Sequence, residues 1–288
     1  MTSRKEILVT GATGRQGGAV ARCLLEKGQK VRIMTRHPEN ARGWKEAGAE
    51  VVRGDFDDYR SLEEAVRGVR GVFLMGTPYG DGPGREVGQG RSMVYACMEE
   101  GVPHLVYSSV CGADRDTGIP HFDSKCEVEE YVRESGLTYT ILRPVSFMDN
   151  FESPGVRNSL EDGVLSLPLS PETTLQMICV DDIGEFAWGV FRNPGTFSGK
   201  EIDLAGDERK IKDAVAELSC AMNRPIRYAR MSGSEAHDRL GYDVAVMYEW
   251  LDEVGSGVDI QGLRDLYGIR LISFSRYLGK SGLYRKAA

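Results

Sequence analysis

Three glycines near the start of the chain have the spacing of a phosphate-binding turn. Gly11, Gly14 and Gly17 form the pattern G-x-x-G-x-x-G directly after a short apolar run and at the start of a helical pattern. At such a turn the backbone N–H groups and the helix dipole attract a pyrophosphate, and glycine permits the tight turn and the close approach. Glycines also form ordinary turns, but the position after a first strand favours a nucleotide site.

The second apolar run ends in Thr35-Arg36-His37 and indicates which nucleotide would bind. An NAD-binding chain places an acidic residue there, which accepts hydrogen bonds from the adenosine ribose. Here a guanidinium stands in its place and suits the 2′-phosphate of NADP(H). The alternative is a solvated surface arginine. Gly54-Asp55, after the third run, offers a carboxylate to the adenine amino group, although Asp after a strand is equally an ordinary turn or helix-capping residue.

Short apolar runs alternate with amphipathic stretches through the first half of the chain. The runs predict strands, and the stretches between them predict helices. Such units form a parallel sheet with helices on both faces, connected by right-handed crossovers. We therefore expect an α/β protein with a doubly wound parallel sheet, the Rossmann NAD(P)-binding fold. The predicted strands are 6–11, 30–36, 49–55, 71–78, 104–110 and 137–144, and the predicted helices are 16–27, 39–47, 60–68, 85–100 and 122–135.

The alternation breaks after Pro144. Residues 145–175 contain prolines and glycines without a clear helical period, which predicts an excursion on the substrate side. The chain is expected to return to the sheet over 176–206, beginning with a strand at 174–180. We expect an NADP-binding Rossmann core from residues 1–150, and a smaller C-terminal substrate-side lobe from residues 151–175 and 207–288.

The composition argues against several classes of protein. The 36 lysines and arginines against 43 aspartates and glutamates give a net charge of −7, which disfavours binding to nucleic acid by phosphate neutralisation. No apolar run approaches the roughly 18 residues of a membrane span, and the N-terminus lacks the pattern of a signal peptide. The six cysteines form no CxxC pair and have no histidine at metal-ligand spacing. We therefore expect no metal, no disulfides and a cytoplasmic location.

Four segments, in order, carry a family resemblance. GATGRQGG (11–18), Arg36, GDFDD (54–58) and HFDSKCEVEEY (121–131) resemble the NmrA-like branch of the atypical short-chain dehydrogenases/reductases. The resemblance implies NADP(H) as the cofactor and assigns residues to each part of it. These are Gly11, Ala12, Thr13, Gly14, Arg15, Gln16 and Gly17 at the pyrophosphate, Thr35 and Arg36 at the 2′-phosphate, Asp55 and Phe56 at adenine, Thr77, Pro78 and Tyr79 on the nicotinamide side, Lys125 at the nicotinamide ribose, and Phe147 and Asn150 over the ring.

The chain departs from ordinary short-chain dehydrogenases at the expected reaction centre. Those enzymes use Tyr-x-x-x-Lys, in which the tyrosine transfers a proton and the lysine holds the ribose. The matching residues here are His121 and Lys125, and Tyr131 would lie on another part of the helix surface. Three interpretations stay open. Lys125 only binds the cofactor and hydride chemistry is lost; or His121, Lys125 or water donates the proton; or His121 merely begins a helix and Lys125 is solvated.

Other residues have weaker patterns. Ser109 ends the fifth predicted strand, where short-chain dehydrogenases keep a substrate-orienting serine, and Cys126 would be a reactive thiol if Lys125 lowered its pKa. The glycine-rich segment 77–90 is a candidate lid. A group of apolar side chains predicts either the lining of a substrate pocket or ordinary core: Phe147, Met148, Phe151, Met247, Tyr248 and Trp250.

Together these patterns favour an NADPH-dependent reductase of an apolar carbonyl, quinone or activated alkene, with Lys125 and His121 as the catalytic residues. The alternative is a non-catalytic redox sensor, which binds NADPH and NADP+ with different affinities and regulates a protein partner. Either function is compatible with a homodimer.

Overall fold

The computed structural model describes residues 5–78 and 82–281, and the chain divides into two compact units. The first unit is Met1–Pro144 with Val180–Asp203, and the second is Val145–Cys179 with Leu204–Ala288. Each unit has its own sheets and its own cluster of buried apolar side chains. We therefore describe each unit by itself.

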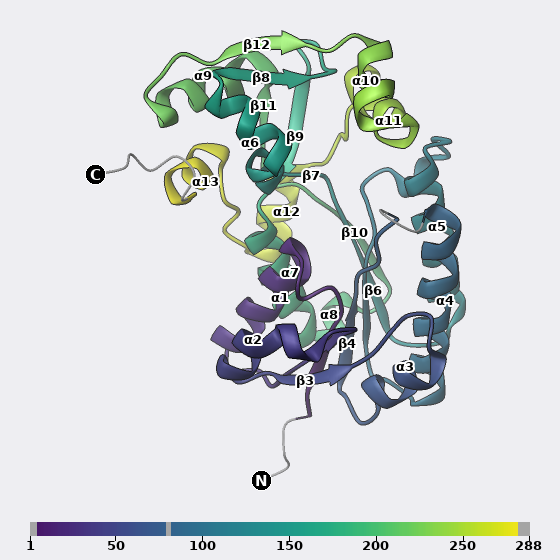
Figure 1. The fold of residues 1–288 in the computed structure, drawn as a ribbon. Coiled ribbons are helices and arrows are strands. Elements are labelled where there is room, and N and C mark those ends of the chain that lie inside the picture. Colours follow the sequence, from purple (N-terminus) through teal and green to yellow (C-terminus); the bar gives the residue numbers. More distant parts are fainter. Residues whose placement is uncertain (1–4, 79–81, 282–288) are drawn as a thin grey trace. The chain divides into compact units, whose positions relative to one another are not determined.

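The first unit is built on a seven-stranded sheet, and the predicted doubly wound parallel fold is confirmed (Figure 1). Its central strands are short and apolar because both faces are covered, and Ile7, Leu8 and Val9 are wholly buried. In spatial order the strands are β10 (Lys200–Leu204), β6 (Tyr139–Pro144), β5 (Leu105–Ser108), β4 (Gly71–Leu74), β1 (Ile7–Val9), β2 (Val31–Thr35) and β3 (Glu50–Arg53).

The strand order reverses between β1 and β4. From β1 the chain moves outward to β2 and β3, and it then returns to add β4, β5 and β6 on the other side of β1. Open α/β sheets bind ligands at the carboxyl ends of the strands beside such a reversal. Thr10 ties the two strands together at this point. Its hydroxyl accepts a hydrogen bond from the Met75 backbone N–H at 2.8 Å and donates one to the Met75 carbonyl at 3.0 Å.

Helices cover both faces of this sheet (Figure 1). On one face, helices bury an apolar cluster that includes Leu62, Met93 and Val128. On the other face, two helices pack closely because Gly184 has no side chain; a Cβ there would lie 3.0 Å from the Ala19 carbonyl oxygen. The first group is α3 (Tyr59–Val66), α4 (Pro83–Glu99) and α5 (Pro120–Glu134), and the closely packed pair is α1 (Arg15–Glu26) and α7 (Val180–Arg192). Short helical elements complete the unit: η1 (Pro38–Ala41), α2 (Arg42–Glu46), η2 (Ala113–Arg115) and α8 (Pro194–Phe197).

The predicted lid at 77–90 is wrong for its second half. α4 begins at Pro83, so residues 83–90 are helical. Gly90 has a packing role in this helix, because a Cβ there would lie 2.6 Å from a methyl group of Val128 on α5. Gly90, one of the glycines that predict a loop, therefore allows two helices to approach closely.

The second unit contains two small sheets. One joins β11 (Asp207–Lys210), β9 (Thr174–Ile178) and β7 (Ser146–Phe147), and the other joins β12 (Arg227–Arg230) and β8 (Val164–Leu167). The prediction that 174–180 returns to the central sheet is wrong. Leu175 and Met177 of β9 belong to the buried cluster of the second unit, so this strand pairs with β7 and β11 instead. The chain returns to the first unit over Val180–Asp203, which contains α7, α8 and most of β10.

Helices surround these two sheets. Residues 145–175 show no helical period in sequence but contain a short helix that begins at Pro154, a position where the missing proline N–H is no loss. The buried cluster of this unit includes Met148, Phe151 and Phe274. The helical elements are η3 (Met148–Glu152), α6 (Pro154–Glu161), α9 (Ile211–Met222), α10 (Gly233–Leu240), α11 (Tyr242–Glu253), α12 (Ile260–Tyr267) and α13 (Phe274–Lys280).

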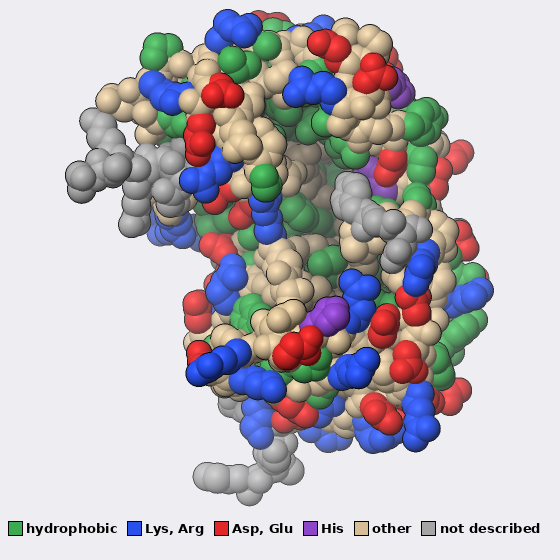
Figure 2. Space-filling view, viewed as in Figure 1, with side chains coloured by type: hydrophobic (Ala, Val, Ile, Leu, Met, Phe, Trp, Pro, Cys, Tyr) green, Lys and Arg blue, Asp and Glu red, His purple; other side chains and the backbone are tan. Residues whose placement is uncertain are grey.

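The surface mixes charges of both signs. On the face shown in Figure 2, acidic and basic side chains are interspersed. Within the described residues no helix has the length and apolar character needed to cross a membrane. In 5–78 and 82–281, no three His, Cys, Asp or Glu side chains are grouped so that they could hold a metal ion. All six cysteines are free thiols.

Candidate functional site

The glycine turn after β1 is so tightly folded that two of its glycines, Gly11 and Gly17, have no room for a side chain. Gly11 has φ of +64°, a backbone conformation that favours glycine. A Cβ on Gly17 would lie 2.5 Å from the carbonyl carbon and oxygen of Gly11, which is backbone and has no room to move aside. The turn is closed by a hydrogen bond from the Gly14 N–H to the Gly11 carbonyl at 2.9 Å. Gly11 therefore has a conformational reason to be glycine, and Gly17 a steric one.

Helix α1 begins at this turn with an uncapped end. Gly14 is its N-cap residue, no side chain caps the first turn, and no acidic residue lies in it. The positive end of the helix dipole is thus available to an anion. Among the other residues assigned to the pyrophosphate, Ala12 is buried, and Thr13 and Arg15 are exposed. The Gln16 side chain is also buried and donates a hydrogen bond to the Ser108 hydroxyl at 2.5 Å, so its side-chain amide is engaged within the protein.

Two arginines lie at the carboxyl ends of the neighbouring strands β2 and β3. Arg36 follows Thr35 and is exposed, and Arg53 is the residue of β3 that pairs in register with Thr35. The Thr35 hydroxyl accepts a hydrogen bond from the His37 backbone N–H at 3.2 Å. Arg53 has no motif of its own in the sequence, and only the strand register brings it beside the position of Arg36. The edge of the sheet thus carries two cations where the sequence predicts one.

Asp55 has a structural role in the turn after β3. One oxygen of its carboxylate accepts a hydrogen bond from the Asp57 backbone N–H at 3.2 Å. Gly54 before it is required for packing, because a Cβ there would lie 2.4 Å from a side-chain carbon of Met34. Phe56 is half-buried against the apolar cluster beneath α3 and α4. These contacts fit the interpretation of Asp55 as an ordinary turn residue. The role of Asp55 and Phe56 at adenine stays a prediction.

Lys125 lies in a buried ion pair that the sequence does not indicate. Its ammonium Nζ is 2.6 Å from Oε1 of Glu86, and the Ser124 hydroxyl donates to Oε2 of the same carboxylate at 2.8 Å. Glu86 is 2% exposed and Lys125 is 9% exposed. The interpretation of Lys125 as a solvated lysine is therefore wrong, because α4 contributes a counter-charge that buries it. Glu86 lies within a glycine-rich stretch, which gives no sign of a buried acid.

The other residues near this pair are also buried. His121 is enclosed at the start of α5, where its ring meets Phe122 edge to face at 4.7 Å between centroids. Tyr107 and Ser109, on and just after β5, are buried side chains whose hydroxyls have no hydrogen-bond partner within the described part of the chain. Tyr131, the tyrosine nearest after Lys125 in sequence, lies instead beside Arg91, whose guanidinium is 5.8 Å from its ring. Ser109 therefore keeps a free hydroxyl at the carboxyl edge of the sheet.

Cys126 is not an activated thiol. Burial, with the negative charges of Glu129 and Glu130, raises the pKa of Cys126 above its usual value. A reactive cysteine needs the opposite shift, because the thiolate is the nucleophile. The suggestion that Lys125 lowers the pKa of its neighbour is therefore wrong, since the ammonium is paired with Glu86.

The remaining predicted cofactor residues fall in two places. In the first unit, Thr77 is exposed and Pro78 is buried after β4, while Tyr79 lies outside the described residues. In the second unit, Phe147 and Asn150 line a small cavity of about 40 Å³. Its other walls are mostly apolar and include three of the side chains predicted as pocket lining or core; the full set is Ser146, Phe147, Asn150, Phe151, Val156, Leu167, Leu175, Met177 and Tyr248. Met148 is buried core, and Met247 and Trp250 pack against that core.

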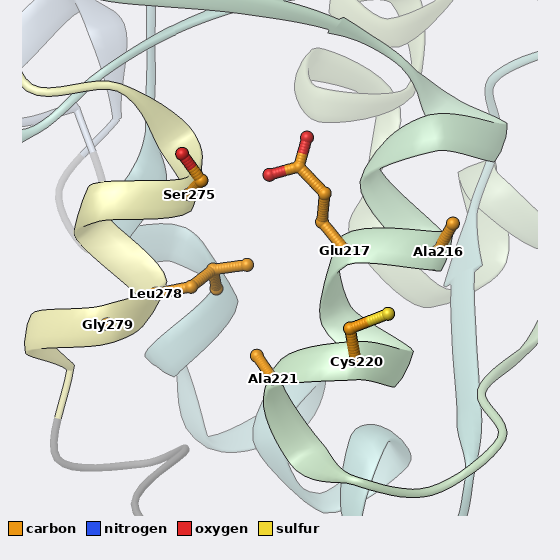
Figure 3. A pocket seen from close by; sticks show the side chains of 7 residues that line it. All are labelled: Ala216, Glu217, Cys220, Ala221, Ser275, Leu278 and Gly279. Atoms are coloured by element: carbon orange, nitrogen blue, oxygen red, sulfur yellow. The ribbon is translucent and has the colours of Figure 1, made fainter.

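A larger groove in the second unit involves none of the predicted site residues. It has a volume of about 560 Å³ and lies between α9 and α13, with Glu217 pointing into the space between the two helices (Figure 3). One carboxylate oxygen of Glu217 accepts a hydrogen bond from Arg209 at 2.5 Å. The walls are small or apolar residues: Ala216, Cys220, Ala221, Ser275, Leu278 and Gly279.

Comparison with known proteins agrees with this arrangement. The NmrA-like family matches residues 3–283. The (4-alkanoyl-5-oxo-2,5-dihydrofuran-3-yl)methyl phosphate reductase of Streptomyces griseus is 33% identical over 241 residues, which cover 81% of this chain and 80% of the relative. The NADPH-dependent quinone oxidoreductase of Escherichia coli, solved with NADPH, is 25% identical with a TM-score of 0.80, and the match covers 95% of this chain and 98% of that one.

A regulator shares the same fold. The negative transcriptional regulator NmrA, solved in complex with NADP, is 21% identical with a TM-score of 0.79, and the match covers 97% of this chain and 95% of that one. The family match extends over both units of the fold. It includes the glycine turn, the carboxyl end of β2 and helix α5, which carries Lys125. The resemblance expected from the sequence is confirmed, and the chain belongs to the NmrA-like family.

Proposed function

We propose that the protein binds NADP(H) and is an NADPH-dependent reductase of an apolar carbonyl, quinone or activated alkene. The observation that carries this proposal is the buried Lys125–Glu86 pair, because it holds a lysine rigidly at the helix position that serves the cofactor in short-chain dehydrogenases. An ion pair with both partners largely removed from water is stable only with good geometry. Such a pair is more typical of a functional site than of a solvated helix face.

The residues of the first unit fit the dinucleotide. The turn has no room for a side chain at Gly17, needs the positive φ of Gly11, and leaves the first turn of α1 uncapped, which suits a pyrophosphate. Arg36 and Arg53 at the ends of β2 and β3 supply positive charge for a 2′-phosphate. The first unit thus supports NADP(H) over NAD(H). The roles of Asp55, Phe56, Thr77, Pro78, Tyr79, Phe147 and Asn150 remain part of the proposal.

When bound, NADPH supplies a hydride to the substrate, and the reduction is completed by one proton. Lys125 and His121 are the chain's candidate groups for holding and delivering that proton, with water as the third source. A quinone or activated alkene needs little help with the proton, so the missing tyrosine is tolerable for these substrates.

One observation favours a second candidate, a non-catalytic NADPH/NADP+ sensor. The position that carries the phenol in Tyr-x-x-x-Lys is occupied by His121, which is buried. The NADP-bound NmrA regulator shares the fold, so a role in regulating a protein partner is compatible with this architecture. In either role we propose a cytoplasmic protein, and a homodimer is compatible with both.

Calorimetric titration with NADPH, NADP+ and NADH tests the cofactor. Arg36→Ala and Arg53→Ala should each weaken NADPH binding by about 1.5–3 kcal/mol, as expected for hydrogen bonds to a charged group, and leave NADH binding nearly unchanged. Arg60→Ala is the matched control, because Arg60 is also exposed, lies on α3 and pairs with Glu64 of the same helix. Absence of binding to any dinucleotide would overturn both candidate functions.

Reduction assays separate the two candidates. NADPH oxidation is followed with benzoquinones and enones as hydride acceptors. Turnover that Lys125→Met lowers by at least about tenfold would support the reductase. Tight NADPH binding, a large difference in affinity between NADPH and NADP+, and no turnover with any acceptor would support the sensor instead.

A further inference from the structure

Lys125 and Glu86 form an ion pair in which both carboxylate oxygens of Glu86 are engaged. Glu86 uses both of its oxygens, one toward the Lys125 ammonium at 2.6 Å and one toward the Ser124 hydroxyl at 2.8 Å. The carboxylate and the ammonium come from different helices, α4 and α5, so the pair also joins those helices. One positive and one negative charge cancel within the pair.

The pair lies at the strand reversal of the sheet. Gly76 follows β4 closely, and a Cβ on Gly76 would lie 3.3 Å from Oε1 of Glu86, the same oxygen that holds Lys125. β4 is one of the two strands at which the strand order reverses, and ligands of open α/β sheets bind at the carboxyl ends of those strands. The placement of Glu86 beside this edge follows from the geometry of the first unit alone.

Three ionisable groups near the pair, Tyr107, Cys126 and Glu129, add no uncompensated charge. Tyr107 is wholly buried beneath α4 and α5, and burial, with the charges of Glu86 and Glu129, holds the pKa of its phenol well above the usual range. Burial likewise raises the pKa of the Cys126 thiol, so both groups stay neutral. Glu129 is already bound by two hydrogen bonds from Arg143, at 2.8 and 2.7 Å. Glu86 and Lys125 are therefore the ion pair that lies beside Gly76 at this edge.

We propose that Glu86 is a positioning residue that holds Lys125 at this edge and, by cancelling its charge, sets the preference of the site between NADP+ and NADPH. The inference rests on the proposed binding of NADP(H). The oxidised nicotinamide ring is a cation and the reduced ring is neutral, so an uncompensated charge at this edge acts on one form only. An unpaired ammonium disfavours NADP+, and an unpaired carboxylate favours it.

The two partners are expected to have opposite effects. Glu86→Gln keeps the shape of the side chain and leaves Lys125 without its counter-charge, so it should lower the affinity for NADP+ relative to NADPH by about tenfold, an effect of the size expected for one partly buried unit charge. Lys125→Met leaves the carboxylate alone and should shift the affinity ratio about tenfold in the other direction. The double variant should return the ratio to within about twofold of the starting protein.

The test is calorimetric titration of the full chain and these three variants with NADP+ and NADPH at neutral pH. Because both ligands are measured on each variant, a partly inactive preparation changes the binding stoichiometry and not the ratio of affinities. Glu99→Gln is the matched control, since it removes one negative charge from an exposed position of the same helix and should leave the ratio unchanged.

Each outcome has a distinct meaning. Failure of the starting protein to bind either dinucleotide overturns the proposed function itself. Binding by the starting protein, with single variants that shift the ratio in the same direction or not at all, overturns the role of Glu86 and leaves the proposed function standing. Opposite shifts that cancel in the double variant establish the role of the pair.

Discussion

The side-chain amide of Gln16, in the first turn of α1, donates a hydrogen bond to the Ser108 hydroxyl at the end of β5 across 2.5 Å. Both side chains are buried. The bond ties the start of the helix to a strand that lies two positions away from β1 in the sheet. The glycine turn is therefore held at both of its ends in sequence, by Thr10 before it, which bonds to the residue after β4, and by Gln16 within it, which bonds to β5.

Replacing Ser108 with alanine should destabilise the protein by about 1–3 kcal/mol, because it leaves the buried Gln16 amide without its acceptor. Urea unfolding at neutral pH measures the loss. The matched control is Ser109→Ala one residue later, whose buried hydroxyl has no partner in the described part of the chain and should be lost at less cost. Equal losses in the two variants would contradict the role given to the Gln16–Ser108 bond.

Gly17→Ala should abolish tight dinucleotide binding and destabilise the first unit. The added methyl would lie 2.5 Å from the Gly11 carbonyl, so the turn must open, at a cost of about 1–3 kcal/mol. Gly43→Ala is the comparison, because this glycine is exposed in α2 and a Cβ there meets no atom within 4 Å. We expect Gly43→Ala to raise stability by about 0.5–1 kcal/mol and to leave binding unchanged. Calorimetry and urea unfolding report the two quantities, and intact NADPH binding by Gly17→Ala would refute the steric argument.

The sheet and the glycine turn could be predicted because both depend on local patterns. A strand covered on both faces appears in the sequence as an apolar run, and a turn position that admits no Cβ is occupied by glycine. The destination of β9 could not be predicted in the same way. Its alternation is that of a strand, but whether Leu175 and Met177 join one core or another depends on contacts far away in sequence.

Two residues of the candidate site, Glu86 and Arg53, likewise could not be predicted from the sequence. Lys125 is recognisable from its motif, whereas Glu86 lies 39 residues before it in a glycine-rich stretch that resembles a loop. Arg53 becomes a candidate only through the strand register that pairs it with Thr35. Sequence patterns therefore indicate the groups that a motif names, and tertiary contacts supply the groups that hold them in place.

Arg143 on β6 should be among the most sensitive positions for stability. Its guanidinium donates to Glu129 through two nitrogens, at 2.8 and 2.7 Å, and it also contacts Asp114 and Glu201. Arg143→Met would remove two hydrogen bonds from the Glu129 carboxylate, which is 0% exposed and keeps its contact with Arg133 at 2.6 Å, and should destabilise the protein by about 3 kcal/mol.

Two further variants check this reasoning by urea unfolding. Arg42→Ala removes an exposed arginine that pairs with Glu46 on its own helix, and it should change stability by less than about 1 kcal/mol. The double variant Arg143→Met with Glu129→Leu removes both charges and should recover part of the loss. A loss as small for Arg143→Met as for Arg42→Ala would mean that the buried network contributes little.

His104, directly before β5, should make the stability of the first unit depend on pH. Its Nε2 lies 2.9 Å from the Thr140 hydroxyl, and that hydroxyl donates to the Phe197 carbonyl at 2.8 Å. Thr140 must therefore accept from His104, which assigns the proton to Nε2 of a neutral ring. Burial lowers the pKa of His104 from 6.5 to about 4. Well above pH 6.5 the ring is neutral in both the folded and the unfolded chain, so it adds no pH dependence to the stability.

As the pH falls from about 6.5 toward 4, the unfolded chain binds a proton that the folded chain does not. Stability should therefore fall by about 1.4 kcal/mol per pH unit from this residue alone. His104→Gln keeps a donor for Thr140 but does not titrate, so the difference in unfolding free energy between the two proteins should shrink or reverse as the pH is lowered. Urea unfolding of both proteins at pH 7, 6 and 5 measures that difference, since the other titrating groups are common to both. Parallel stability curves over this range would show that the folded protein accommodates the charged ring.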